Sequence, residues 1–253
     1  MSILDKNFIK HFITNNTKEV DEVNGKKFFE HKPVPYRWTH GATDLHLGDG
    51  LLIYSIIQLM RYKSLVCLGS GGGFIPRIMT QARLDLHDQE IFNGNRDLSL
   101  GDIGVTYLVD AANGIGGNID YLEKDSFFRY QFAPRFIKET TEKAFYDYFV
   151  KQDIKIDFLH IDAGHSYEDV KRDFELYSTL LSDYGMISIH DTDKRYQKEF
   201  VVTEDEKEYF QEWGGPTKFI EEIGPEWKQF NFFNTGIYPL KPASTGLTLI
   251  QRA

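Results

Sequence analysis

Acidic and histidine side chains follow two short apolar runs in the second half of the chain. Asp162 and His165 come after the run Ile156–Ile161, and Asp191 follows the run Met186–Ile189. Runs that end abruptly in glycine, acid or histidine are typical of buried parallel strands whose carboxyl ends face a ligand crevice. A helix pattern separates the two runs, so we expect parallel neighbouring strands with both carboxylates at the same end.

Two neighbouring carboxylates repel each other unless a positive charge lies between them. Mg²⁺ is typically held by one or two carboxylates together with water and substrate oxygens. Asp162 and Asp191 therefore form a candidate site for a divalent cation. The alternative interpretation is structural, with Asp162 ending a strand and Asp191 beginning a solvated loop.

A glycine-rich turn follows an earlier apolar run, Leu65–Leu68, and a helix pattern from Phe74 to Ala82 resumes after it. Glycines let the backbone approach a ligand closely, and the first turn of a helix offers unpaired N–H donors. The turn therefore predicts a cradle for an anion or nucleoside, although a tight turn that needs positive φ would give the same pattern. Its residues are Gly69, Ser70, Gly71, Gly72 and Gly73.

An acid ends the next predicted strand, where Asp110 follows the run Val105–Val109. Nucleotide-binding α/β folds use an acid at this place to accept hydrogen bonds from a ribose diol. The separation from Gly69 is about twice the usual one of about 20 residues. We attribute the excess to an irregular insertion at residues 84–103.

The order of the remaining patterns predicts an α/β fold in one domain, residues 1–253. It adds an N-terminal helical or lid extension, residues 1–60, and a second irregular insertion, residues 111–132. Helices are expected at Asp49–Arg61, Glu142–Val150, Thr217–Ile223 and from the capping residue Ser166 onward. Further strands are expected at Arg135–Lys138, Lys228–Phe233 and Leu247–Gln251, the last two as an antiparallel edge hairpin.

The overall charge and the cysteine content limit the classes of partner. A net charge of −9 argues against long nucleic acid and against an anionic membrane surface. The single cysteine, Cys67, excludes an internal disulfide and predicts a buried thiol in a reducing compartment, with the cytoplasm as the expected location. The N-terminus lacks the pattern of a signal peptide, and the apolar run 51–60 is too short to span a bilayer. A small-molecule partner is expected, and a homo-oligomer is compatible with the sequence.

These motifs resemble those of class I S-adenosylmethionine-dependent methyltransferases. The turn that begins at Gly69 looks like their first motif, and the runs Phe158–Glu168 and Gly185–Asp191 are similar to a subgroup with sugar O-methyltransferases of antibiotic pathways. The resemblance extends from about Leu51 to Thr192. It implies a Rossmann-like sheet, mostly parallel with an antiparallel edge hairpin, and helices on both faces.

The resemblance also implies a cofactor, S-adenosylmethionine, and a metal. The implied cofactor-binding residues are Gly69, Ser70, Gly71, Gly73, Asp110 and Asp162. In catechol-type and antibiotic-sugar enzymes of this fold, acids that end the corresponding strands bind a divalent cation such as Mg²⁺. By that resemblance Asp162 and Asp191 are metal ligands, and Thr192 stands where the catechol-type enzymes have an asparagine ligand.

His165 is the predicted general base, with Asp162 beside it in the catalytic set. It lies three positions after Asp162 and just before Ser166, and a lysine fills the corresponding place in the catechol enzymes. Methyl transfer is an in-line displacement, so the protein mainly aligns the reactants and removes one proton, for which imidazole is suited. His165 acting as a loop cap or metal ligand, and His190 as the base, are the alternatives.

The acceptor predicted from a metal site is a hydroxyl flanked by a second oxygen, as in a sugar, nucleotide sugar or related diol. Two other functions compete with this one. Tyr167 and Lys171 have the spacing of the catalytic pair of short-chain dehydrogenases, in which case the glycine turn would bind NAD(P). A non-catalytic methyltransferase-like module is the third interpretation.

Overall fold

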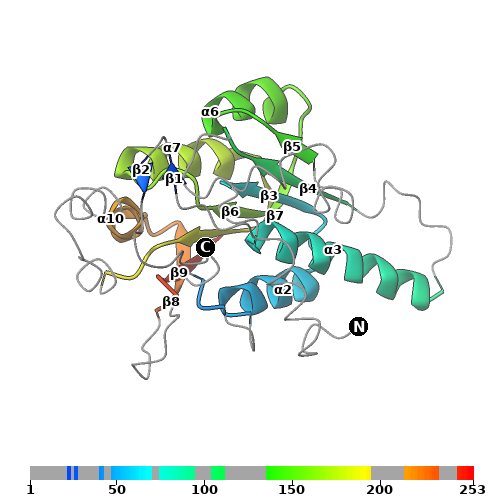
Figure 1. Cartoon of the computed structure of the whole chain (residues 1–253). Coiled ribbons are helices and arrows are strands. Elements are labelled where there is room, and N and C mark those ends of the chain that lie inside the picture. The colour runs from blue at the N-terminus through cyan, green and yellow to red at the C-terminus, as the bar shows by residue number, and fades with distance from the viewer. Residues whose placement is uncertain are drawn as a thin grey trace.

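A seven-stranded sheet forms the centre of the computed structural model of this chain (Figure 1). The structure describes residues 22–23, 26–27, 40–42, 47–69, 74–94, 104–111, 135–194, 214–233 and 244–253. A separate pair of short strands, β1 (Glu22–Val23) and β2 (Lys26–Lys27), pairs antiparallel.

The strand order in the sheet is β5-β4-β3-β6-β7-β9-β8. All neighbours from β5 to β7 pair in parallel, whereas β9 is antiparallel to both β7 and β8. The chain therefore starts at the central β3, moves outward on one side, and returns to β6 on the other, which creates a switch point where ligands bind in such folds. The strands are β3 (Ser64–Leu68), β4 (Val105–Val109), β5 (Arg135–Ile137), β6 (Ile156–Ile161), β7 (Leu181–His190), β8 (Trp227–Phe232) and β9 (Leu247–Arg252).

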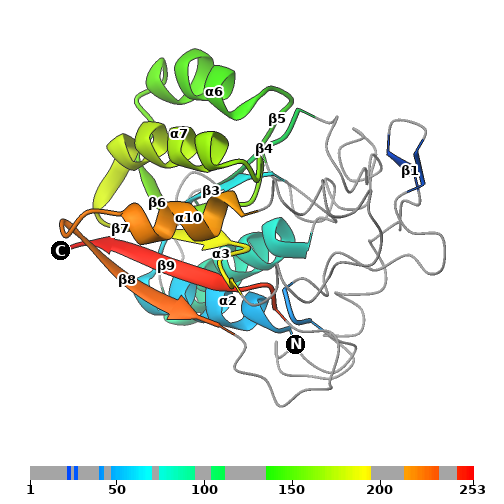
Figure 2. The ribbon, with the colours of Figure 1, turned by 90° about the vertical axis from the view of Figure 1, so that its left-hand side faces the viewer.

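Helices cover both faces of the sheet, as Figures 1 and 2 show. One face carries α2 (Asp49–Met60) and α3 (Phe74–Phe92). The other face carries three helical segments: α6 (Thr141–Ala144) continued by the π-helical turn η3 (Phe145–Val150), α7 (Tyr167–Tyr177) and α10 (Gly215–Glu222). This arrangement confirms the predicted mostly parallel sheet with an antiparallel edge pair.

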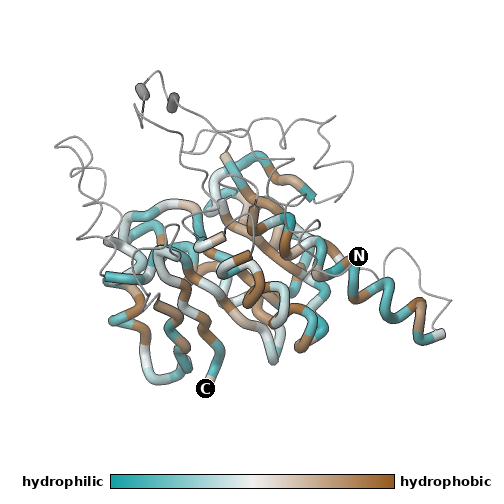
Figure 3. Tube along the Cα trace, turned by 60° about the horizontal axis from the view of Figure 1, so that its bottom comes forward, coloured by the Kyte–Doolittle hydropathy of each residue, from teal (hydrophilic) through white to brown (hydrophobic). Residues whose placement is uncertain are grey.

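Two separate sets of apolar side chains fill the spaces between sheet and helices, and the strands between them are predominantly hydrophobic (Figure 3). Alternate residues of one strand serve opposite faces, so Phe158 packs toward α2 and α3 while Leu159 packs toward α7. The second set includes three rings in edge-to-face contact, which we call the aromatic cluster: Phe145, Phe149 and Tyr177.

The helix α3 continues to Phe92, although the sequence predicted an irregular insertion from residue 84. Leu84 and Leu86 extend its apolar side, and Asp85 accepts a hydrogen bond of 2.6 Å from the Tyr54 hydroxyl on α2. These contacts outweigh the polar composition on which the prediction relied. Most of the second predicted insertion, from residue 112, lies outside the described residues.

The unit from Ser166 to β7 also differs in its end points. Ser166 caps α7 as predicted, because its hydroxyl accepts a hydrogen bond from the Asp169 N–H at 3.1 Å. The helix ends at Tyr177 and a short 3₁₀ turn, η4 (Ser178–Leu180), follows; β7 then begins at Leu181 instead of Met186. Within the described part of the chain, no helix is long and apolar enough to cross a membrane.

Candidate active site

Three residues stand at the carboxyl ends of the central strands, at the same level of the sheet. Leu68, Ile161 and Ile189 are aligned with one another across β3, β6 and β7. The next residue of each strand is therefore Gly69, Asp162 or His190. The register brings Asp162 beside His190 at the carboxyl edge, on the face of the sheet that α2 and α3 cover.

Gly69 allows the first turn to lie against the end of β6. Its φ of +81° is in the left-handed region, and a Cβ at this position would lie 2.0 Å from the Asp162 carbonyl oxygen. The Gly69 N–H donates to Val109 O at 2.9 Å, and the Asp162 N–H donates to Leu68 O at 2.9 Å. The glycine is thus required by contact with the chain's own backbone.

The other predicted cofactor residues are placed only in part. Asp110 follows Val109 at the end of β4, and its N–H donates to Ile137 O at 3.1 Å, so Asp110 and Gly69 end adjacent strands. Ser70, Gly71 and Gly73 lie outside the described residues. The proximity of Asp110 to the turn agrees with a nucleoside site, and its role stays a prediction.

The two predicted carboxylates meet around His165. Its Nε2 lies 2.9 Å from Asp191 Oδ2 and 3.6 Å from Asp162 Oδ1. Asp191 lies one residue beyond His190, and it adopts a φ of +58°, a conformation uncommon for a residue other than glycine. One potential ligand atom from each of Asp162, His165 and Asp191 lies within 4.8 Å of the others.

Thr192, the third predicted metal ligand, is fully buried. Its hydroxyl oxygen lies 2.9 Å from Thr248 Oγ1 on β9, and Thr248 also hydrogen-bonds Asn231. The Thr192 hydroxyl is therefore engaged with the edge hairpin.

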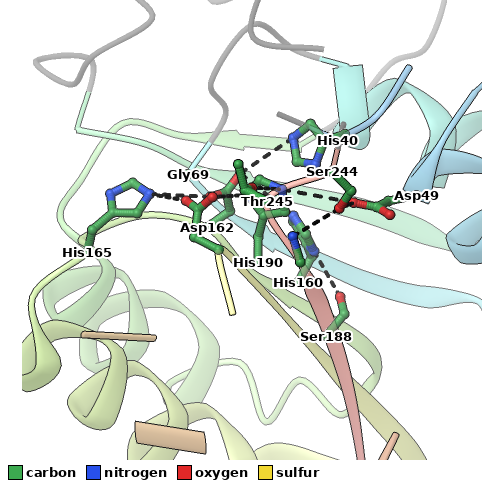
Figure 4. Close-up of polar contacts among 12 residues, drawn as sticks. His40, Asp49, Gly69, His160, Asp162, His165, Ser188, His190, Ser244 and Thr245 are labelled. Atoms are coloured by element: carbon green, nitrogen blue, oxygen red, sulfur yellow. Dashed lines mark hydrogen bonds and ion pairs between the residues drawn. The ribbon is translucent and has the colours of Figure 1, made fainter. Parts of the chain in front are cut away.

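Three buried histidines lie beside Asp162, and we call His40, His160 and His190 the histidine cluster (Figure 4). His190 Nδ1 is 3.3 Å from Asp162 Oδ1 and also 3.3 Å from Asp191 Oδ1. His40 Nε2 and His160 Nε2 lie 3.7 and 3.9 Å from Asp162 Oδ2. Asp162 is therefore the common neighbour of all three rings and of His165.

Two residues from the start of the β9 segment complete this region. Thr245 Oγ1 lies 3.0 Å from His190 Nε2, and Ser244 donates a hydrogen bond of 2.6 Å to Asp49 Oδ2 at the start of α2. His40 pairs with Ser244 in an isolated antiparallel bridge. Segments that are distant in sequence thus meet next to the histidine cluster.

Charge is divided unequally among these groups. Burial alone would raise the pKa of Asp162, but the His190 charge and the nearby rings of His160, His165 and His190 hold that pKa well below its usual range. The pKa of Asp191 is likewise lowered, against the effect of burial, by the His190 charge and by the nearby His165 ring. Burial would lower the pKa of His165, yet its contacts with both carboxylates raise it to about 9. The pKa of His190 is also raised against the effect of burial, by the charges of Asp191 and Asp162.

The pKa values of the remaining buried groups are shifted toward their neutral forms. Burial and the His190 charge lower the pKa of His40 well below its usual range, and burial lowers that of His160. Burial raises the pKa of Asp49 to about 6. The site therefore pairs two cationic histidines with two carboxylates and keeps two neutral imidazoles next to them.

The group formed by Asp162, His165 and Asp191, which we call the acidic set, fits a divalent cation in its donor chemistry. It offers two carboxylates and one imidazole, and Asp191 Oδ1 is buried without accepting a hydrogen bond. Carboxylate oxygens are the ligands that Mg²⁺ and Mn²⁺ prefer.

Sequence reasoning did not identify His40, Asp49, His160, Ser244 or Thr245 as site residues. One signal was present for His160: together with Asp162 it places polar groups at alternate positions of an otherwise apolar strand, and alternate positions share a face. His40 and Asp49 carried no comparable signal, because long-range contacts bring them to the site.

A family of proteins described as methyltransferase domains matches residues 66–192, which contain the end of β3, the strands β4 to β7 and the acidic set. The fold and this match define a class I methyltransferase. The chain belongs to this methyltransferase domain family, and its class uses S-adenosylmethionine as the methyl donor. A match of 38% identity over 61 residues links it to the uncharacterized protein y4gI of Sinorhizobium fredii; these residues are 24% of this chain and 6% of that protein.

Solved structures of methyltransferases share the fold at low sequence identity. The O-methyltransferase TomG of Streptomyces achromogenes, in complex with SAM, has a TM-score of 0.55 and 12% identity over 86% of this chain and 87% of its own. An O-methyltransferase of Bacillus cereus, in complex with SAH, has a TM-score of 0.52 and 15% identity over 81% of this chain and 80% of its own. CalS11, a TDP-rhamnose 3'-O-methyltransferase of calicheamicin biosynthesis, has a TM-score of 0.51 and 13% identity over 81% of this chain and 78% of its own.

The family match overturns the dehydrogenase alternative. The structure agrees, because the Tyr167 hydroxyl donates to Glu222 on α10 and Lys171 Nζ lies 5.7 Å from the centre of the Tyr167 ring. Both residues lie on α7, and Tyr167 also packs against the second apolar set.

Proposed function

We propose that this protein transfers the methyl group of S-adenosylmethionine to a hydroxyl oxygen of a small acceptor, with a divalent cation held by Asp162 and Asp191. The observation that carries the proposal is the meeting of two carboxylates and His165 at the carboxyl ends of β6 and β7. These ends lie beside the glycine turn after β3, where the methyl donor is expected to bind.

The residues divide the reaction between them. Asp110 and the glycine turn would hold the donor, and His165 would accept the proton of the acceptor hydroxyl. A bound divalent cation would orient that hydroxyl, lower its pKa and, by its charge, favour the neutral form of His165 that a base requires. His190 has both ring nitrogens near other groups of the site and is 2% exposed, so it is better placed to orient Asp162 and Asp191.

The proposed acceptor is a sugar, nucleotide sugar or related diol. Two adjacent oxygens can chelate a cation, and CalS11 supports the choice because it acts on TDP-rhamnose with the same fold. Thr192 is omitted from the proposed ligand set because its hydroxyl is engaged with Thr248.

The donor site can be tested by calorimetry on the full chain. S-adenosylmethionine should bind the native protein, and Gly71→Val should abolish binding because a branched side chain blocks the approach of the backbone. An unchanged affinity in a folded variant would sink the assignment of the turn.

The base is tested by the His165→Gln variant with Mg²⁺ saturating. The methyl-transfer rate should fall by at least about a hundredfold, with the affinity for the donor intact and the acidic limb of the pH profile lost. A near-normal rate with the same acidic limb would transfer the role to His190 or to metal-bound hydroxide.

The cation is tested by thorough removal of metal from the native enzyme, which should abolish methyl transfer. Full turnover without metal would refute the proposed role of the cation.

A further inference from the structure

The histidine cluster presents a second set of potential ligands, on the side of Asp162 away from His165. His40 Nε2 is 3.7 Å from Asp162 Oδ2, and His190 Nδ1 is 3.3 Å from Asp162 Oδ1. One ligand atom from each of the three residues lies within 4.8 Å of the others. The His40 and His190 rings are only 4.0 Å apart between centroids.

The separation between His40 and Asp162 is too long for a hydrogen bond, whose donor and acceptor lie about 2.7–3.2 Å apart. It is close to the spacing of two ligands on one cation. Two atoms that each lie about 2.1 Å from a tetrahedral metal are about 3.4 Å from one another. A cation placed between His40 and Asp162 could therefore be bound by both groups after only small shifts of their side chains.

His160 provides an independent indication at the same place. Its ring is fully buried, and Nε2 makes no hydrogen bond although it lies 3.9 Å from Asp162 Oδ2. Its other nitrogen is held by Ser188 Oγ at 2.8 Å, which fixes the ring. An unsatisfied buried polar atom costs about 1–3 kcal/mol. Nε2 is thus kept, at a cost, facing the carboxylate that His40 and His190 share.

His190 is oriented in the manner of a metal-binding histidine. Thr245 Oγ1 lies 3.0 Å from Nε2, and Nδ1 lies 3.3 Å from Asp162 Oδ1 and 3.3 Å from Asp191 Oδ1. Metal-bound histidines almost always engage their second nitrogen with such an outer partner.

We propose that His40, Asp162 and His190 bind a transition-metal cation of the Zn²⁺ class. This site differs in its preferred metal from the acidic set, which favours Mg²⁺. Imidazole nitrogens suit Zn²⁺ and Co²⁺, whereas Mg²⁺ favours oxygen ligands. The ion would tie the segment at residue 40 to the ends of β6 and β7. This binding requires neither the methyl donor nor an acceptor, so it does not rest on the proposed function.

The test uses the full chain, stripped of metal and then titrated with Co²⁺ in excess Mg²⁺ so that oxygen-rich sites are filled. We expect one Co²⁺ per chain, a visible ligand-field spectrum, and a rise in Tm because the ion binds only the folded state. His40→Gln and His190→Gln should each weaken Co²⁺ binding by at least about tenfold. His87→Gln is the matched control, since His87 lies on α3 next to Asp88.

Three results would overturn the proposal. One is a native chain that binds no Co²⁺ in the presence of Mg²⁺. Another is a loss of Co²⁺ binding in His165→Gln together with full binding in His40→Gln, which would place the ion in the acidic set. X-ray absorption of the Co²⁺-loaded native chain needs no variant: two imidazole ligands are expected, and fewer than two would contradict the site.

Discussion

The two faces of the central sheet bury different kinds of side chain. The face toward α2 and α3 contains the histidine cluster, whose three rings lie 3.3–3.9 Å from the Asp162 carboxylate. The face toward α6, α7 and α10 contains the aromatic cluster, in which the Phe145 and Phe149 rings each lie 5.3 Å from the Tyr177 ring in edge-to-face contact. Both faces bury apolar side chains. The first face adds charged and hydrogen-bonded groups to them, and the second adds edge-to-face aromatic packing.

The difference suggests that the clusters on the two faces of the sheet have different roles. Edge-to-face aromatic pairs add about 0.5–1.5 kcal/mol each beyond their buried area. Buried charged groups, in contrast, give little net stability and become costly when one partner is removed. We therefore expect the aromatic cluster to contribute more to stability than the histidine cluster, and the chemistry to depend mainly on the histidine side. Four variants test this expectation.

The largest effect is expected from Asp162→Asn, which removes the charge shared by four histidines. Methyl transfer should slow by about a thousandfold, equivalent to about 4 kcal/mol of transition-state stabilisation. The rate of single-turnover methyl transfer measures it. Asp183→Asn, the same change at an exposed position of β7, should leave the rate unchanged. Equal rates in the two variants would contradict the assignment of chemistry to this face.

Phe149→Ala tests the aromatic side. Phe149 is fully buried between Tyr107 and Tyr177, so its truncation should lower the free energy of unfolding by about 3–4 kcal/mol. Chemical denaturation measures the loss, and the affinity for S-adenosylmethionine should stay as in the native protein. The control is Tyr146→Ala, because Tyr146 is exposed on the same π-helical turn. A stable variant with impaired catalysis would reverse the comparison.

Asp173 is the exception on the aromatic side, since it is a buried carboxyl that accepts a hydrogen bond of 2.6 Å from Thr141. Burial raises its pKa to about 6, against about 3.9 in an unfolded chain. Between about pH 4 and 6 the folded protein keeps a proton that the unfolded chain releases, so this group lowers stability as the pH rises through that window. The cost is fully present above pH 6 and absent below pH 4.

The Asp173→Asn variant should remove that dependence. Its free energy of unfolding, minus that of the native protein, should increase by about 2–3 kcal/mol from pH 4 to pH 6.5. Denaturant titrations at several pH values supply the difference, with Asp153→Asn as the control at an exposed site. A difference that stays constant with pH would show that Asp173 is ionised throughout.

The smallest effect is expected from Thr245→Val, which deletes the partner of His190 Nε2 without touching a carboxylate. A net hydrogen bond of about 1 kcal/mol corresponds to roughly a fivefold loss in kcat, with KM for the methyl donor unchanged. Thr245→Ser should restore the rate, and Thr179→Val, at the exposed position of the η4 turn, should not alter it. A variant in which KM rises and kcat does not would argue against a positioning role for Thr245.

The sequence was sufficient for the parts of this structure that depend on local patterns. Apolar runs ended by polar residues located β3, β4, β6 and the end of β7, and Ser166 located the start of α7. The acids at strand ends were expected to meet, and His165 does lie next to both. Each of these features follows from periodicity, capping or the common direction of parallel strands.

The remaining parts depend on contacts between distant residues. The length of α3 is decided by packing of Leu84 and Leu86 and by the Tyr54–Asp85 hydrogen bond, which a polar composition conceals. His40 reaches the site through its bridge to Ser244 near β9. The positive φ of Asp191, which directs its carboxylate to His165, likewise has no signature in a His-Asp-Thr sequence.

The position of β9 between β7 and β8 has a consequence for the newly synthesised chain. Ser244 bonds Asp49 across 195 positions, and Thr245 supplies the partner of His190. A chain that leaves the ribosome from its N-terminus can assemble β3 to β7 early, but these contacts cannot form until residues 244–252 emerge. We expect ribosome-stalled chains that lack β9 to gain protection of the β3–β6 amides from hydrogen exchange while the surroundings of His190 remain open, so that structure precedes function during translation.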